Sequence, residues 1–122
     1  MAGEISVRAW LGFAKGGSAS HLDSLVLSLT MTGTSFFRHR QTVGTVQEAL
    51  VLGEFSPAEA YFLAINRDAT NYVTFKPASS GVASAVALPG EVVLFRWERN
   101  VVAPFVQADT AAIQLDYLLI QK

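Results

Sequence analysis

Residues Tyr61–Phe75 read Tyr-Phe-Leu-Ala-Ile-Asn-Arg-Asp-Ala-Thr-Asn-Tyr-Val-Thr-Phe, and this stretch decides the fold class. It begins with an unbroken apolar run, ends in alternating apolar and polar residues, and holds the Asn- and Asp-rich segment Asn66–Asn71 between them. Asn and Asp side chains hydrogen-bond to the nearby backbone and tolerate unusual dihedral angles, so they favour chain reversal. The stretch therefore predicts a central β-hairpin, with a buried strand before the turn and an amphipathic strand after it.

Similar short strands are expected on both sides of this hairpin. Apolar and polar residues alternate with a period of two in residues 4–13, 21–31, 91–99 and 111–121, which is typical of half-buried strands. Pro89-Gly90 predicts a tight turn, and Pro104 predicts that residues 100–110 are irregular. About eight short strands separated by Gly, Pro, Asn and Asp indicate an antiparallel sandwich or barrel. The prediction is an all-β chain that forms one jelly-roll-like antiparallel β-sandwich domain over residues 1–122.

The composition indicates surplus apolar surface. Hydrophobic residues make up 51% of the chain and charged residues only 16%, against about 25% in ordinary globular domains. We therefore expect part of the surface to be covered by another subunit. A formal net charge of −1 provides no field that would attract nucleic acid or an anionic membrane, so neither is expected as a partner. No signal peptide is expected from the first residues, and no apolar run approaches the roughly 18 residues of a membrane helix.

Residues that could carry chemistry are few. The chain has no cysteine, which excludes disulfides and thiolate metal sites, and its two histidines, His21 and His39, are expected at a surface or interface. No serine lies in a nucleophile elbow, and the Asp68 region is expected to cap a turn and not to hold calcium. We therefore predict that the chain is not an enzyme and needs no cofactor or metal. A small hydrolase with two carboxylates that meet only in the folded chain stays open as an alternative.

Aromatic and basic residues provide the candidates for an interface. Arg38 and Arg40 share one face of an expected strand, where either a salt-bridged surface or a small basic stripe would result. The predicted interface residues are Phe36, Phe37, Arg38, Arg40, Trp97 and Phe105. The predicted turn residues are Asn66, Asp68, Asn71, Pro89 and Gly90. Trp10, Tyr72 or Trp97 would alternatively form a stacking platform for a sugar, so a carbohydrate- or receptor-binding module stays open.

Three segments resemble the small β-sandwich virion proteins of tailed bacteriophages. These segments are Gln41–Thr45 continuing through Ala49–Gly53, then Ala64–Val73, then the Leu88–Glu91 turn. The resemblance lies in turn and core residues and does not extend to the N-terminal part around the Gly16-Gly17-Ser18 loop. It implies a structural protein of the virion, assembled in the host cytoplasm, with no catalytic residues.

Within a virion, the expected role is capsid decoration, as a cement protein. Such a protein forms a homo-oligomer, for example a trimer, and binds other virion proteins such as the major capsid protein. A tail or fibre component is the alternative within the same family.

Overall fold

The computed structural model describes residues 4–31, 36–53, 55–56, 60–98 and 100–121, and this part of the chain contains strands and no helix. The strands are β1 (Ile5–Val7), β2 (Trp10–Lys15), β3 (Ser18–Asp23), β4 (Leu27–Leu29), β5 (Phe36–Val43), β6 (Glu48–Ala49), β7 (Ala60–Asn66), β8 (Val73–Lys76), β9 (Ala85–Ala87), β10 (Val92–Phe95), β11 (Phe105–Ala108) and β12 (Ile113–Gln121). Every strand pair is antiparallel. The predicted all-β class is confirmed.

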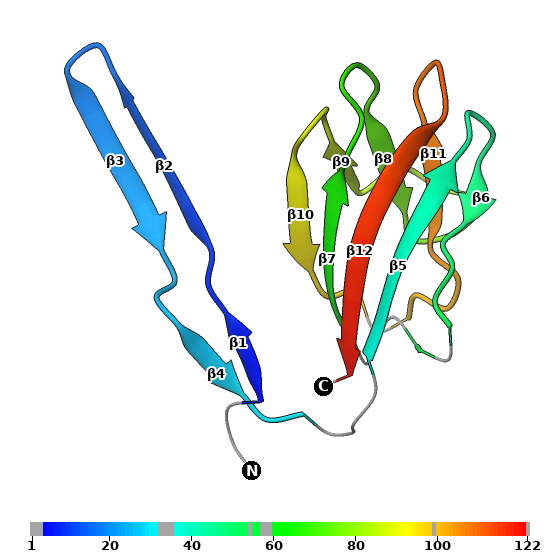
Figure 1. The fold of residues 1–122 in the computed structure, drawn as a ribbon, viewed down its shortest axis with the longest axis horizontal. Helices are drawn as coiled ribbons and strands as arrows, with labels where there is room; N and C mark the ends of the chain where they lie inside the picture. The colour runs from blue at the N-terminus through cyan, green and yellow to red at the C-terminus, as the bar shows by residue number, and fades with distance from the viewer. Residues whose placement is uncertain (1–3, 32–35, 54, 57–59, 99, 122) are drawn as a thin grey trace. The chain divides into compact units, whose positions relative to one another are not determined.

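The contacts between residues divide the chain into two compact units, a hairpin unit of residues 1–32 and a sandwich unit of residues 33–122. In the hairpin unit, β1 pairs with β4 and β2 pairs with β3 (Figure 1). Gly16 and Gly17 connect β2 to β3 with φ angles of +60° and +80°. Positive φ at both central residues gives a turn whose twist matches that of the flanking strands, and glycine adopts it without strain. The prediction of one domain over residues 1–122 stays a prediction.

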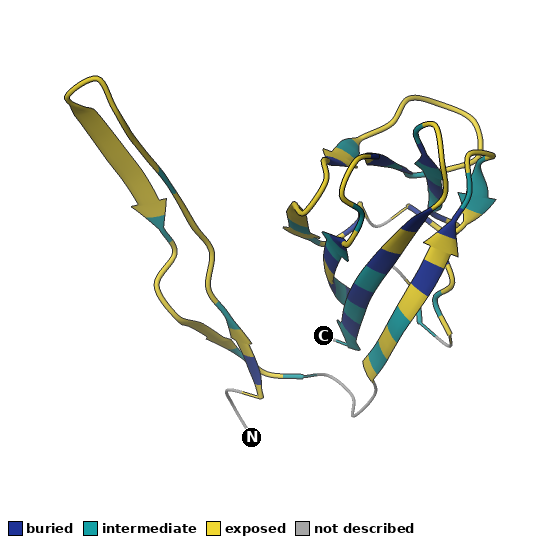
Figure 2. Ribbon diagram, turned by 45° about the horizontal axis from the view of Figure 1, so that its top comes forward, coloured by how far each residue is buried: buried dark blue, intermediate teal, exposed yellow. Residues whose placement is uncertain are grey.

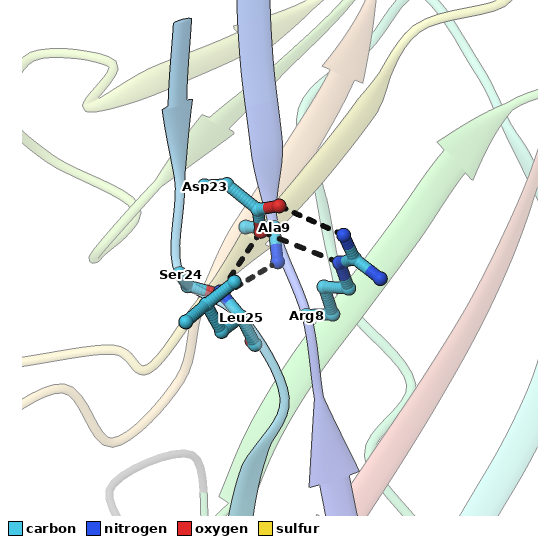
Figure 3. A network of polar contacts seen from close by, with 5 residues as sticks. All are labelled: Arg8, Ala9, Asp23, Ser24 and Leu25. Atoms are coloured by element: carbon cyan, nitrogen blue, oxygen red, sulfur yellow. Dashed lines mark hydrogen bonds and ion pairs between the residues drawn. The ribbon is translucent and has the colours of Figure 1, made fainter.

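Between the β1–β4 pair and the β2–β3 pair the strand pairing is interrupted. A network of polar contacts connects the two chain segments there (Figure 3). Ser24 N donates to the Ala9 carbonyl and Ala9 N donates to Ser24 Oγ, both at 2.9 Å. Arg8 Nη2 donates to Asp23 Oδ2 at 2.8 Å, and Leu25 N donates to Asp23 Oδ1 at 2.8 Å. The Arg8 guanidinium, and then the Leu25 N–H, hold the pKa of Asp23 below its usual value. The backbone N–H groups of Ala9, Ser24 and Leu25 are therefore partnered although no ladder continues at the break.

The sandwich unit is a jelly roll. One sheet has the order β10-β7-β12-β5 and the other has the order β6-β11-β8-β9. Numbered one to eight from β5 to β12, the strands follow the orders 6-3-8-1 and 2-7-4-5, which is the arrangement of two interlocked Greek keys (Figure 1). The predicted jelly-roll-like sandwich of about eight strands is thus confirmed for this unit.

The connection after the central apolar strand differs from the prediction. β7 and β8 belong to different sheets and do not pair, so residues 67–72 form a corner between the sheets and not a hairpin turn. Pro89 and Gly90 likewise lie between β9 and β10, which also belong to different sheets. Asn, Asp, Pro and Gly favour chain reversal in a hairpin and in a corner between two sheets alike, so the sequence pattern alone does not distinguish the two.

The prediction of irregular structure after residue 100 is also wrong in part. β11 is a central strand that pairs with β6 on one side and with β8 on the other. Pro104 directly precedes this strand, and its carbonyl accepts a hydrogen bond from Leu50 N at 2.9 Å. Because its missing N–H lies outside the β11 ladder, proline is tolerated at this position.

The core lies between the two sheets, and β7 and β12 contribute every second residue to it, which gives the alternating colours along the long strands in Figure 2. Phe62 from one sheet meets Phe75 from the other edge to face, with ring centroids 6.0 Å apart. In β12, the inward residues are Ile113, Leu115, Tyr117 and Leu119. The intervening residues of these strands point to the outside, and in one sheet they form an unusual surface.

Candidate subunit interface

The outer face of the β10-β7-β12-β5 sheet carries apolar side chains where polar ones are usual. The strand register aligns Leu94, Leu63 and Leu118 in one row, followed by Arg38 at the β5 edge. The next row aligns Val92 with Ile65. The face that we call the outer sheet face consists of Phe36, Arg38, Arg40, Tyr61, Leu63, Ile65, Val92, Leu94, Asp116, Leu118 and Ile120. All of these residues are exposed or half-buried. Contiguous apolar patches are often interaction sites, so this face is the candidate subunit interface.

Charged groups border the apolar rows. Arg40 donates two hydrogen bonds to Asp116, from Nε to Oδ1 at 2.6 Å and from Nη2 to Oδ2 at 2.8 Å. Arg67 Nε donates to Asp116 Oδ2 at 2.9 Å. The hydrogen bonds from Arg40, and to a smaller extent the bond from Arg67, hold the pKa of Asp116 well below its usual range. Two guanidinium groups share one carboxylate, so this border retains positive charge beside a shallow pocket of about 210 Å³ that Leu63, Ile65 and Leu118 help to line.

The structure brings three of the six predicted interface residues together on this face. Phe36, Arg38 and Arg40 point outward from β5, and 68% of Phe36 is exposed. Phe37 points the other way, where it stacks on His39 with ring centroids 5.4 Å apart and packs against the core. Trp97 and Phe105 lie elsewhere in the sandwich.

The indole of Trp97 lies in the core, where only 5% of the residue is exposed. Its Nε1–H is buried and has no acceptor among the residues that the structure describes. Phe105 is half-buried in β11 of the other sheet. The interface role of these two residues stays a prediction, although neither lies on the outer sheet face.

The leucines and isoleucines of this face are not among the interface residues predicted from the sequence. Tyr61–Ile65 is apolar at every position, which predicts a strand buried on both sides. In the structure, Phe62 and Ala64 are fully buried while Leu63 and Ile65 are not. The unbroken apolar run could have indicated this surface. A strand with only one side in the core does not need apolar residues on its other side, so their presence there points to a second covering layer.

The predicted turn residues fix the corners of the sandwich. Asp68 Oδ2 accepts hydrogen bonds from Asn71 N at 2.6 Å and from Thr70 N at 3.0 Å. The Asn71 N–H, followed by that of Thr70, lowers the pKa of Asp68. Gly90 has a φ of +78°, and Glu91 N donates to the Leu88 carbonyl at 2.9 Å across the Pro89-Gly90 turn. These oxygens are occupied by the backbone of the turn itself, which agrees with a capping role.

A buried polar cluster lies between the two sheets near β6. Tyr117 donates from its hydroxyl to the Val51 carbonyl, and burial raises the pKa of Tyr117 well above its usual value. Gln41 Nε2 donates to Glu48 Oε1 at 2.9 Å, and Glu48 Oε2 accepts from Gly44 N at 3.0 Å. The polar atoms of the cluster bond to one another, so its arrangement serves to hold the β5–β6 connection. Across the described ranges, no three His, Asp or Glu side chains gather as metal ligands would.

A second apolar surface lies on the hairpin unit. Leu11 and Leu22 are directly opposite in the β2–β3 ladder and are 80% and 79% exposed. Phe13 points to the same side of the ladder, and we call Leu11, Phe13 and Leu22 the hairpin face. On the other side, the Trp10 ring stacks on His21 with centroids 5.8 Å apart, beside a shallow pocket of about 390 Å³.

Comparisons with known proteins add little to this geometry. No family model and no curated protein matches the chain. A solved structure described as "Bacillus endospore appendages form a novel family of disulfide-linked pili" is similar with 14% sequence identity and a TM-score of 0.45, over 78% of this chain and 96% of that one. The part of the chain that the structure describes holds no helix that could span a lipid bilayer. The protein is a small β protein, and its function has to be argued from its own surface.

Proposed function

We propose that the chain is a structural subunit that assembles with copies of itself through the outer sheet face. The observation that carries this proposal is the row of Leu94, Leu63 and Leu118, three neighbouring apolar side chains that are exposed or half-buried on the outside of the sheet. Covering apolar surface stabilises an assembly by roughly 25 cal/mol per Å² before the entropy of association is subtracted. The paired charges at the border would give the contact its register, since charge pairs contribute specificity more than affinity.

The particle that we propose is a bacteriophage virion, in which the chain decorates the capsid and binds the major capsid protein. The resemblance of the Gln41–Gly53, Ala64–Val73 and Leu88–Glu91 segments to phage virion proteins supports this assignment. The jelly roll is also a fold that viral capsids use. A tail or fibre component is the alternative place in the same particle. The proposed role requires no catalytic residue, cofactor or nucleic acid.

Light scattering on the purified full-length chain tests the self-assembly. We expect a homo-oligomer that Leu118→Lys converts to a monomer, because the lysine places an unpaired charge in the apolar row. Val82→Lys is the matched control, since Val82 is an exposed apolar residue in the loop between β8 and β9. A wild-type chain that stays monomeric at high concentration contradicts the proposal.

Mass spectrometry of purified virions tests the assignment to a particle. In the phage that encodes the chain, each virion should contain many copies, as decoration of a symmetric shell requires. Absence of the chain from the particle contradicts the assignment while leaving the self-assembly untouched.

One observation favours a second candidate, a carbohydrate-binding module. Trp10 is 61% exposed and its indole lies against Gly12, so one broad ring face is available for stacking on a sugar. A glycan array separates the two candidates, because a decoration protein should give no signal on it. Binding that Trp10→Ala abolishes would favour the module.

A further inference from the structure

The β2–β3 hairpin needs a cover that its own two strands do not provide. Nearly every residue of both strands is exposed, including the pair Leu11 and Leu22. A two-stranded hairpin by itself is at most marginally stable in water, and three strands or a packed face are needed for independent stability. Among the described residues, no further strand pairs with the outer edge of β2 or of β3, and Lys15 is the one lysine of these two strands that would discourage pairing with another strand.

The outer sheet face matches the hairpin face in chemistry and dimensions. Each hairpin strand has six residues and is therefore about 20 Å long, close to the length of the seven-residue β7. Both surfaces pass from apolar to polar along the strands: the hairpin from Leu11 to Lys15, and the sheet from Leu118 to Gln114. Two sheet surfaces of this kind pack face to face at a separation of about 10 Å.

We infer that the hairpin face of one copy packs on the outer sheet face of a second copy. This inference rests on the proposed self-assembly and names the two surfaces that meet. Contact between two outer sheet faces would leave both hairpins uncovered, whereas contact between hairpin and sheet covers both apolar surfaces of the chain. Such a contact is head-to-tail, so repeated use of it closes a ring or extends a filament.

The area of one such contact is small, so the strength of the assembly has to come from ring closure. A hairpin about 10 Å wide and about 20 Å long buries on the order of 600 Å² of accessible surface, counted on both partners. Each copy takes part in two contacts, once with its hairpin and once with its sheet. A closed ring has as many contacts as copies, so about 600 Å² is buried per copy, which is typical of a weak contact. In a closed ring a copy leaves only when its two contacts break together, which strengthens the assembly.

Cysteine cross-linking tests the inference, because the chain has no cysteine of its own. Full-length Leu22→Cys and Leu118→Cys chains, one of them labelled with ¹⁵N, are mixed and oxidised, and the disulfide dimers are identified by mass. We expect the yield of the dimer between Leu22→Cys and Leu118→Cys to be several-fold higher than the yield of the dimer between Leu22→Cys and the control Val82→Cys. The pair Leu11→Cys and Leu63→Cys repeats the measurement at an independent position.

Three results would overturn the inference. Dimers of Leu22→Cys with itself show that hairpins meet hairpins, and dimers of Leu118→Cys with itself show that sheets meet sheets. An oligomer in which neither mixed pair cross-links above the control shows that the hairpin is covered in another way, for example by its own chain. In each of these results the self-assembly survives, whereas a monomer in light scattering removes both proposals.

Discussion

The side-chain amide of Asn66, at the end of β7, donates a hydrogen bond of 3.1 Å to the backbone carbonyl of Ala87, at the end of β9 in the opposite sheet. Asn66 is completely buried. The same amide nitrogen donates to the Asn71 carbonyl at 2.8 Å, and Asn66 Oδ1 accepts from Asp68 N at 2.9 Å. One side chain therefore provides the bonds that a ladder would otherwise provide where the chain passes between sheets.

Replacing Asn66 should destabilise the sandwich more than the loss of its few side-chain atoms from the core would, because its hydrogen bonds are lost as well. Asn66→Ala leaves two carbonyls and one N–H without their partners, so we expect a loss of about 3 kcal/mol in the free energy of unfolding. Asn66→Asp should lose at least as much, because a carboxylate would face two carbonyl oxygens. Urea denaturation measures both, with the exposed Asn100→Ala as a control that should change stability by less than about 0.5 kcal/mol. Equal midpoints for Asn66→Ala and Asn100→Ala would refute this role.

The Asp116 ion pairs should make stability depend on pH in the acid range. The pKa of Asp116 is lower in the folded chain than the ordinary value of about 3.9, so its contribution is complete above that value and is lost as the pH falls through the folded pKa. Asp116→Asn should destabilise the chain by about 1 kcal/mol at pH 7, since the arginines are largely exposed and solvent screens them. The difference between the urea midpoints of wild type and variant should therefore begin to shrink below about pH 4 and continue to shrink down to about pH 2.

The control for this experiment is Asp109→Asn, which makes the same change of charge in the loop after β11. It should follow the wild type at every pH apart from a small uniform shift. If the difference in urea midpoint between wild type and Asp116→Asn stayed constant down to pH 2, the substitution would act through packing and not through the lost charge.

The neighbours Phe36 and Phe37 should respond in opposite ways. Phe37→Ala removes a ring that packs against the core and should lower the free energy of unfolding by about 2 kcal/mol. Phe36→Ala removes a ring from the outer sheet face and should leave the stability of the subunit unchanged within about 0.5 kcal/mol. Its effect should instead be a weaker self-association, which light scattering over a dilution series measures. A larger stability loss for Phe36→Ala than for Phe37→Ala would reverse the assignment of the two faces.

The sequence was sufficient to predict the fold class, because the alternation in segments such as residues 111–121, which contain β12, indicates strands with one side in a core. It was insufficient for the connections. The Asn66–Asn71 segment has the same turn chemistry in a corner as in a hairpin, and the difference lies in the partner of Asn66, Ala87, which is distant along the chain. Such a long-range bond is not visible in a local pattern.

The candidate interface was predictable only in part. Arg38 and Arg40 are on one face by strand geometry, and the structure adds that Asp116 is the carboxylate that Arg40 meets. The leucine row depends on the pairing order β10-β7-β12, which brings together residues from three distant strands. Trp97 was expected at a surface because tryptophan is common at interfaces, yet the same large apolar ring also suits a core.

Gly12 should control the position of the Trp10 ring. A Cβ atom at Gly12 would lie 2.5 Å from Trp10 Cη2 and 2.9 Å from His21 Cβ, so Gly12→Ala should push the indole away from its place on His21. The chain has two tryptophans, and each gives one indole N–H signal in a ¹H–¹⁵N spectrum. We expect the Trp10 signal to shift in Gly12→Ala while that of the buried Trp97 stays in place.

The control is Gly17→Ala. Its Cβ meets no atom within 4 Å, but alanine there is forced to a φ of +80°, so this variant strains the turn without touching the Trp10 ring. If Gly12→Ala leaves the Trp10 signal unchanged, the indole does not lie over the glycine, and the flat ring face that favours sugar binding is lost as an argument.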